Sequence, residues 1–454
     1  MPAPESRSLA PLDPWSNSTV AAFAAAAPVW GATKALLHAG RGKWAVDTDN
    51  DNKPRFVHAV AGAQMEGKFG YHVIMPPDAD ADTVEVAERE LAEALLHDLG
   101  AYTARLHMMC AVSSATVEAG RAAALPRQMV YLALGLDRRT DLSRVQKDLR
   151  AFAEIKRLSK IGLSVMKLEL GGKSLEYSQR ISPLWFLGVE RKGQVWQERH
   201  NDEQVEVSED WSLLVRPGMW SDWFLWGARS LRQLAYMPRD LFATDARSRL
   251  AVGVGVLVLI RARIDPAPSV TLTPQEMLDF CGEDSNPRDR WGQRSLRDAL
   301  LAAVAQQGEW GCQVDYSRWP RDLQPLIPQG EVEKVEGKER EPAPHGYWDS
   351  FLAAQVVFRL PAGVAAANHG AAIARRKHDG GRKRSGAGRP IDVHALRLRL
   401  GWTQRQLAEA IGVSDTAVRA YESGRKHPSA ETARRLRQVA EAARQTEPNG
   451  SVTR

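Results

Sequence analysis

The residues of this chain whose types and spacing could do chemistry are mostly basic, and they concentrate towards its C-terminal end. Residues 371–454 contain 18 Lys and Arg against 8 Asp and Glu, which gives this segment a net charge of +10. The whole chain carries +6, so residues 1–370 are slightly acidic, at −4. Guanidinium and ammonium groups at this density favour binding to a phosphate backbone. The charge pattern therefore indicates a nucleic acid as the partner of the C-terminal segment.

Residue patterns typical of enzymes are absent from the sequence. Gly171-Gly172-Lys173-Ser174 matches the end of a phosphate-binding loop, but Lys167 stands where that loop needs its first glycine. We interpret this segment as a hairpin turn. The eleven histidines form neither a zinc-protease motif nor the histidine pair with a nearby tyrosine that a strand-nicking enzyme would use. We therefore expect no enzymatic activity, no metal and no cofactor, with an enzyme tethered to DNA as a third alternative.

The basic C-terminal segment should position its polar side chains on a compact bundle of short helices over residues 391–440. Thr403 and Ser414 each precede a helical run, where a hydroxyl can accept hydrogen bonds from free backbone N–H groups. Gly412 can take the left-handed conformation that ends a helix. Two helices joined in this way form a helix-turn-helix, whose second helix lies in the DNA major groove. The apolar residues at helical spacing predict one small core, formed by Leu396, Leu400, Leu407, Ala408, Ile411, Val413, Val418 and Tyr421.

The same segment resembles a known family at many fixed positions. The matching residues are Trp402-Thr403-Gln404, Leu407-Ala408, Ile411-Gly412-Val413-Ser414, Val418, Tyr421-Glu422-Ser423-Gly424 and Pro428-Ser429. Over about fifty residues they resemble the Cro and phage-repressor class of helix-turn-helix domains, called the XRE class. The resemblance implies an ion pair between Arg397 in the first helix and Glu422 after the recognition helix. It also implies binding as a homodimer to two-fold half-sites.

The resemblance to the XRE class further implies which side chains contact DNA. Gln404 would hold a phosphate, while Asp415 and Thr416 would face base edges or phosphates. Asp415 departs from the Gln, Arg or Ser that the class often has there; its carboxylate repels phosphate but can accept from cytosine N4. The residues that we assign to DNA binding in this domain are Thr403, Gln404, Ser414, Asp415, Thr416, Arg419, Ser423, Arg425 and Lys426. The alternative is a protein-binding bundle without DNA contacts, which the local charge of +10 disfavours.

The composition of the whole chain is that of a soluble protein with several domains. The 454 residues are 44% hydrophobic and 26% charged, enough for two to four domains with cores of their own. The three cysteines are far apart and odd in number, so we expect no disulfide framework and a cytoplasmic protein. The longest apolar run, Leu250–Ile260, is too short to span a bilayer. We therefore expect no membrane association.

The pattern of elements predicts an α+β chain, mainly α with small β-hairpins, divided into several parts. We expect disorder at 1–18 and 441–454, a small module of unknown role at 19–77 and a connecting Trp-rich segment at 191–245. Two units at 83–190 and 246–360 each combine helices with paired strands, the second with a mobile insertion at 321–344. A flexible basic linker at 361–390 contains Arg382, Lys383 and Arg384, which we also assign to DNA binding, and it leads to the helix-turn-helix at 391–440.

Helices followed by a β-hairpin are typical of winged-helix domains, and this order occurs twice. In the first unit, apolar alternation at 165–170 and 175–182 predicts a hairpin around Gly171-Gly172. In the second, Thr273 and Glu276 predict a capped helix start, and Trp310–Tyr316 would pair with Ala354–Leu360. The basic residues that the two recognition helices would offer are Arg144, Lys147, Arg150, Lys156, Arg157, Arg288, Arg290, Arg294 and Arg297. Alternatively, both sets are solvated basic faces without a DNA partner.

Two winged-helix-like units in series resemble plasmid replication initiators, which bind origin repeats through such pairs. This resemblance implies a bacterial or mobile-element protein that binds double-stranded DNA and recruits host replication proteins. The main alternative is an XRE-family transcriptional regulator, with RNA polymerase as partner and a large N-terminal region for sensing or oligomerisation. Tryptophans crowd around Trp211 and Trp220. They could stack on single-stranded bases, but packing in the core is the interpretation we prefer.

Overall fold

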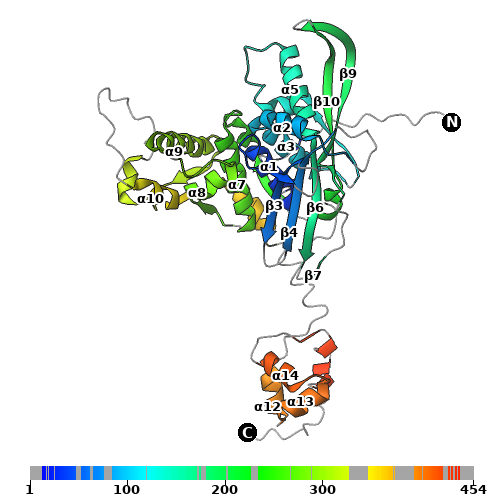
Figure 1. Cartoon of the computed structure of the whole chain (residues 1–454), viewed down its shortest axis with the longest axis vertical. Helices are drawn as coiled ribbons and strands as arrows, with labels where there is room; N and C mark the ends of the chain where they lie inside the picture. The colour runs from blue at the N-terminus through cyan, green and yellow to red at the C-terminus, as the bar shows by residue number, and fades with distance from the viewer. Residues whose placement is uncertain are drawn as a thin grey trace, which may run out of the picture. The chain divides into compact units, whose positions relative to one another are not determined.

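The computed structural model divides into two compact units, residues 1–370 and 371–454 (Figure 1). Both helices and sheets are present, which confirms an α+β chain. No helix within the described ranges is long and apolar enough to cross a membrane. The residues that the structure describes are 13–16, 18, 20–24, 26–47, 53–61, 65–75, 84–118, 120–170, 173–174, 180–200, 203–225, 234–265, 267–287, 289–326, 346–371, 373, 393–400, 402–422, 428–429, 431–432, 435–436 and 438–439.

An antiparallel sheet forms one side of the first unit (Figure 1). Its strands are β2 (Ala45–Asp47), β3 (Lys53–Ala61), β4 (Met65–Val73), β6 (Ile161–Leu170) and β7 (Lys173–Ser174), in that order, with β8 (Ser182–Pro183) also on β6. Strand β4 therefore joins residues 19–77, expected to be a separate module, to the rest of the unit. Phe69 and Tyr71 of β4 are fully buried in the common core, and the Tyr71 hydroxyl donates to the carbonyl of Pro28 at 2.8 Å.

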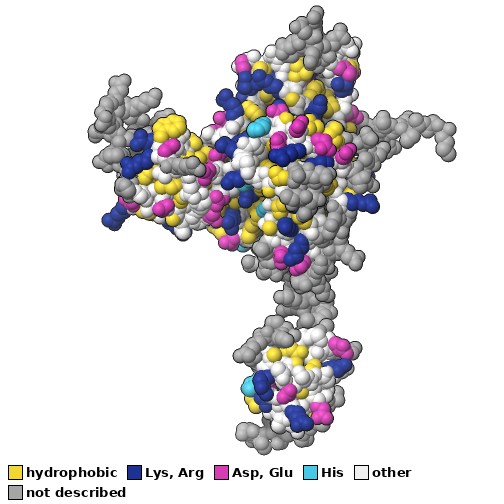
Figure 2. Space-filling view, viewed as in Figure 1, with side chains coloured by type: hydrophobic (Ala, Val, Ile, Leu, Met, Phe, Trp, Pro, Cys, Tyr) yellow, Lys and Arg dark blue, Asp and Glu magenta, His cyan; other side chains and the backbone are white. Residues whose placement is uncertain are grey.

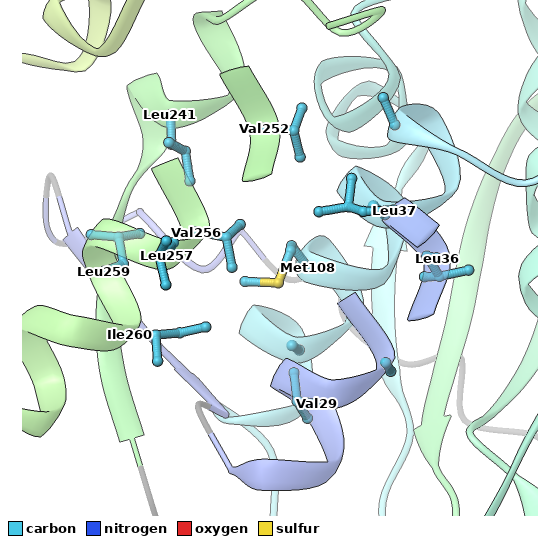
Figure 3. Close-up of a cluster of buried hydrophobic side chains, with 14 of the residues drawn as sticks. Val29, Leu36, Leu37, Met108, Leu241, Val252, Val256, Leu257, Leu259 and Ile260 are labelled. Atoms are coloured by element: carbon cyan, nitrogen blue, oxygen red, sulfur yellow. The ribbon is translucent and has the colours of Figure 1, made fainter. Parts of the chain in front are cut away.

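A helical core lies beside this sheet. Helices α1 (Ala27–His38), α3 (Ala101–Ser114) and α7 (Arg249–Ile264) meet there, with side chains such as Val29, Met108 and Val256 packed together (Figure 3). The apolar run Leu250–Ile260 is entirely buried within α7. Gly253 allows close helix packing, because a Cβ at that position would lie 2.3 Å from the Cys281 sulfur. The two-stranded sheet of β1 (Val20–Ala24) and β11 (Leu234–Pro238) ties the start of the chain to the region before α7.

Two segments of the first unit have helices and a three-stranded sheet in corresponding order, once β6, β7 and β8, which belong to the large sheet, are left out of the first segment. The first copy consists of α3, β5 (Ala123–Pro126), α4 (Arg127–Leu134), α5 (Arg144–Leu158), β9 (Trp185–His200) and β10 (Glu203–Pro217). The second consists of α7, β12 (Ser269–Leu272), α8 (Pro274–Cys281), α9 (Arg290–Ala305), β13 (Gln313–Asp315) and β14 (Val356–Arg359). The sheets are ordered β5-β10-β9 and β12-β14-β13, so in both copies the last strand lies between the other two.

The second copy agrees with the strands and the helix start expected from the sequence. Thr273 caps α8 with the expected reciprocal bonds to Glu276. Strand β13 pairs with β14, as predicted for Trp310–Tyr316 and Ala354–Leu360. The insertion predicted at 321–344 begins with a described 3-10 helix, η3 (Arg321–Leu326), and its remainder lies outside the described residues.

The hairpin predicted around residues 171–172 is present, because Leu170 of β6 pairs with Lys173 of β7 and Glu169 pairs with Ser174, but it belongs to the large sheet and not to the first copy. Residues 165–170 belong to β6, which pairs with β4, β7 and β8 in the large sheet. The hairpin of the small sheet is instead β9–β10, which runs through the segment predicted to be a mere connection at 191–245. On β9, residues 191–197 are exposed on both faces except for Lys192, which is half-buried, so no apolar alternation marks this strand in the sequence. These strands are also much longer than the small hairpins that we expected.

The remaining elements of the first unit are short. They are α2 (Arg89–Asp98), α6 (Trp220–Phe224), η1 (Arg239–Ala243), η2 (Gln306–Trp310) and α10 (Tyr347–Ala353). Trp211 and Trp220 are at most 2% exposed, which confirms their packing role. The side chain of Trp223 and the whole of Trp226 lie outside the described residues. The segment predicted as a linker begins with helical residues at 362–371.

The second unit has its own core, as predicted. It contains α12 (Val393–Arg399), α13 (Gln404–Ile411) and α14 (Asp415–Glu422). All eight residues expected to pack together do so. Val393 and Leu436 complete the buried set.

Candidate nucleic-acid interface

The turn between α13 and α14 is held by the hydrogen bonds that the sequence predicts. The Thr403 hydroxyl accepts from the backbone N–H of Gln406 at 3.2 Å, and the Gln406 side chain accepts from the Thr403 N–H at 2.8 Å. Gly412 ends α13 with φ of +68°, and the Ser414 hydroxyl then accepts from the N–H of Ala417 at 3.2 Å. These bonds satisfy free N–H groups at both helix starts and thereby fix the direction of α14.

Glu422 is the centre of a polar network that joins three helices. Its carboxylate accepts from Arg397 Nε at 2.6 Å and from Gln404 Nε2 at 2.6 Å. Arg397 also donates to the carbonyl of Trp402 at 3.0 Å. Burial opposes ionisation of Glu422, but the hydrogen bonds from Arg397 and Gln404 outweigh it and lower the pKa of this carboxyl. The predicted pair of Arg397 and Glu422 is confirmed.

Several predicted contact residues of the second unit lie at the starts of α13 and α14. Asp415, Thr416 and Arg419 are exposed, and Arg419 Nε lies 3.4 Å from the side-chain oxygen of Gln404. Gln404 is half-buried, and its amide both donates to Glu422 and faces Arg419, so the network positions it. Contacts from these residues to DNA stay a prediction. Predicted contact residues that lie outside the described residues are Ser423, Arg425, Lys426, Arg382, Lys383 and Arg384.

Helix α5 offers fewer free cations than its sequence indicates. Arg144 donates to the backbone carbonyls of Ser208 and Glu209, and its guanidinium lies 5.9 Å from the centre of the Trp196 ring. It therefore fastens β9–β10 to α5, where we had predicted a DNA contact. Arg157 is paired with two carboxylates, Glu154 and Asp98. Within the described ranges, Lys147, Arg150 and Lys156 have no ion-pair partner, and they remain candidates for phosphate contact.

Helix α5 is held in position by the buried carboxylate of Asp148, which we did not predict from the sequence. Asp148 is 3% exposed and accepts from the Tyr131 hydroxyl and from Trp211 Nε1, both at 2.6 Å. It thus ties α5 to α4 and to β10, and burial and this bond raise the pKa of Tyr131. The available signal was its spacing, because Asp148 falls in the helical stripe of the buried residues Ala151 and Ile155.

Helix α9 divides its arginines between two faces. Arg290 and Arg294 are exposed, as a phosphate or base contact requires. Arg297 is only 5% exposed, pairs with Asp298 at 2.8 Å and lies 5.8 Å from the centre of the Tyr347 ring. Its predicted DNA contact is therefore wrong, because Arg297 shares the buried face of the helix with Leu300 and Leu301. Arg288 lies outside the described residues.

Buried histidines and cysteines serve the core of the first unit. Burial lowers the pKa of His107 to about 4, and its ring faces the carbonyl of Val29 at 2.9 Å and the indole N–H of Trp185 at 2.8 Å. Cys110, close to His107 in sequence, is fully buried, and this burial raises the pKa of its thiol. The described residues contain no group of three or more His, Cys, Asp or Glu that could hold a metal ion.

The exposed charges of the first unit are mixed in sign. On the face shown in Figure 2, Lys and Arg side chains are interspersed with Asp and Glu. This distribution agrees with a net charge of −4 for residues 1–370. Any DNA contact of this unit must use local sets of side chains such as those on α5 and α9.

Comparison with known proteins gives one match. Residues 393–439 match the family model described as helix-turn-helix. This range coincides with the helices and the core of the second unit. No curated protein and no solved structure matches the chain. The match supports sequence-specific DNA binding by the C-terminal domain.

Proposed function

We propose that this chain, whose residues 393–439 form a helix-turn-helix domain of the Cro and phage-repressor class, initiates replication of a plasmid or secondary replicon. It would bind repeated origin sites on double-stranded DNA as a cytoplasmic homodimer, distort the duplex and recruit host replication proteins. Binding and distortion suffice for this role, so we propose no covalent catalysis by the chain.

The observation that carries the proposal is the repeated succession of elements in the first unit. Helix, strand, two helices and two strands, with the last strand in the middle of the sheet, is the topology of a winged-helix domain. Its occurrence at 101–217 and again at 249–359 supports two winged-helix units in series. Helices α5 and α9 then occupy the recognition-helix position, which would lie in the major groove.

The exposed cations of these two helices support a DNA role at the same positions. Arg150 on α5 and Arg290 and Arg294 on α9 are exposed, and Lys147 on α5 is half-buried; all four would be able to neutralise phosphates. Arg144 would act indirectly, because its bonds to the carbonyls of Ser208 and Glu209 set the position of the hairpin against α5. The C-terminal domain would add selectivity through α14.

A transcriptional regulator of the XRE class is the second candidate. The observation that favours it is the acidic balance of residues 1–370. In a regulator, this region would sense a ligand or set the oligomeric state, and RNA polymerase would be the partner. Only the C-terminal domain would then select DNA.

Sequencing of fragments bound from plasmid and genomic DNA separates the two candidates. The proteins compared are the full chain, residues 1–370, and residues 1–370 with Lys147→Ala and Arg150→Ala. Arg121→Ala is the matched control, because Arg121 is an exposed cation paired with Glu118 and lies outside α5. The proposal expects residues 1–370 and the control to enrich repeated sites at one locus, and the double variant to lose them. If selectivity disappears with residues 371–454 and the bound sites are promoters, the chain is a regulator.

A further inference from the structure

The most exposed large apolar side chain in the described part of the chain is Trp291, at 78%. Other described tryptophans are buried or half-buried, except Trp196, which is 40% exposed and lies beneath the guanidinium of Arg144. Exposed apolar residues scattered singly are common in proteins. The position of Trp291, in the first turn of α9, is what makes its exposure informative.

The first turn of α9 holds the backbone at Trp291 in a defined position. Asp289 caps the helix by accepting from the N–H of Gly292 at 2.5 Å. A Cβ at Gly292 would lie 3.0 Å from the Cβ of Pro287, so the preceding turn packs closely against the helix start. The carbonyl of Ser285, which precedes this turn, accepts from Trp348 Nε1 at 2.8 Å.

Trp291 shares its helix face with exposed polar groups. Positions 291, 294, 295 and 298 fall on one helical stripe, and all four side chains are exposed. The opposite stripe, which includes Arg297 and Leu300, is buried. Trp291 therefore presents an exposed indole ring in the first turn of α9, and the exposed residues Arg290 and Arg294 lie within one helical turn of it.

We propose that Trp291 reads thymine, by packing its indole ring against the C5-methyl group of a thymine in the major groove of the DNA bound by α9. The inference rests on the proposed function, since it needs α9 to be a recognition helix. The N-terminal residues of a recognition helix are those that reach base edges. Thymine alone presents a methyl group there, and apolar side chains contact it. Arg290 and Arg294 would hold the helix against the flanking phosphates.

Removing the methyl group from the DNA and the ring from the protein tests the same contact from both sides. The probe is a duplex selected from a random pool by the full-length protein, with each thymine replaced in turn by deoxyuracil. Burial of one methyl group contributes about a fourfold change in affinity. We expect one such replacement to lower the affinity of the wild-type protein for the duplex by about fourfold. The same replacement should not change the affinity of the Trp291→Ala variant.

Two further variants serve as a control and as a test of phosphate contact by α9. Ile264→Ala removes another exposed apolar side chain, 56% exposed at the end of α7, and should behave as the wild type does. Arg294→Ala should weaken binding to every duplex and reduce its salt dependence, while keeping the thymine effect. Thermal unfolding should be unchanged in Trp291→Ala, because the side chain is exposed.

The outcomes separate this inference from the proposed function. If no deoxyuracil weakens the wild type, or if Trp291→Ala keeps the same penalty, Trp291 does not read thymine. If Arg294→Ala leaves affinity and salt dependence unchanged, α9 does not bind DNA and the proposed winged-helix role of the second copy fails with it. If Trp291→Ala changes the oligomeric state in sedimentation and not the thymine effect, the ring contacts a second copy of the chain, and the inference is overturned.

Discussion

Replacing Glu422 by glutamine should loosen the helix-turn-helix domain while leaving the first unit intact. Glu422 accepts two hydrogen bonds at 2.6 Å, from Arg397 and from Gln404. Its side chain is 8% exposed and that of Arg397 is 16% exposed, so water screens the pair little. The amide of glutamine has one acceptor oxygen for two donors, and it carries no charge.

The expected loss follows from these two bonds. A hydrogen bond to a charged group contributes about 1.5–3 kcal/mol, and a neutral one about 0.5–1.5 kcal/mol. The substitution weakens both bonds, so we expect the domain to lose about 2 kcal/mol of its free energy of unfolding. A change of this size corresponds to about a thirtyfold increase in the population of the open state.

Hydrogen exchange of the full chain, read by mass spectrometry, measures this change locally. Peptides from Val393–Glu422 should exchange about thirtyfold faster in the Glu422→Gln variant. Peptides from α7, in the separate core of the first unit, provide the internal reference. Glu409→Gln is the matched control, because Glu409 is exposed on α13. Exchange of Val393–Glu422 at the wild-type rate in Glu422→Gln would refute the role of the network.

Three further outcomes are expected. First, the pKa of Glu422 is lowered in the folded domain, so ionised Glu422 stabilises the domain fully above its ordinary pKa of 4.5. This stabilisation is lost as the pH falls through the lower pKa of the folded domain. The hydrogen-exchange rate of α12–α14, corrected for intrinsic rates, should therefore rise below pH 4.5 in the wild type and change less in Glu422→Gln. Second, Asp148→Asn should cost about 2 kcal/mol in urea unfolding, because two buried donors lose a charged acceptor, and an unchanged midpoint would contradict that role. Third, Arg419→Ala should reduce affinity for the selected site about tenfold or more, with a smaller loss on random duplex; equal losses in the binding assay would mean that Arg419 contacts only phosphate.

The helix-turn-helix could be predicted from sequence because its determinants are local. The caps at Thr403 and Ser414 and the turn at Gly412 each depend on residues no more than five positions away. The apolar residues that form its core also lie within fewer than fifty residues, from Val393 to Val439. Even the pair of Arg397 and Glu422 joins helices that this short bundle brings together. Such contacts leave a readable pattern in the sequence.

The first copy of the repeated fold is harder to recognise because its elements are interrupted in the chain. Between α5 and β9, the chain contributes β6, β7 and β8 to the large sheet. The hairpin that follows α5 directly in the sequence is β6–β7, whereas the hairpin that pairs with β5 is β9–β10. In the second copy β13 follows α9 closely, and the long interval before β14 does not disturb the order. The expected strands could therefore be found there.

The candidate interface on α5 and α9 was overestimated for a different physical reason. The number of positive charges on a helix can be read from the sequence, but only the structure shows which of these side chains already have partners within the protein. Arg144 is bound by backbone carbonyls of β10, and Arg157 by Glu154 and Asp98. Arg297 lies on the buried face of α9, where Asp298 and the Tyr347 ring compensate its charge. These arginines hold the helices in place, so any phosphate binding by the first unit would depend on the fewer cations that remain exposed.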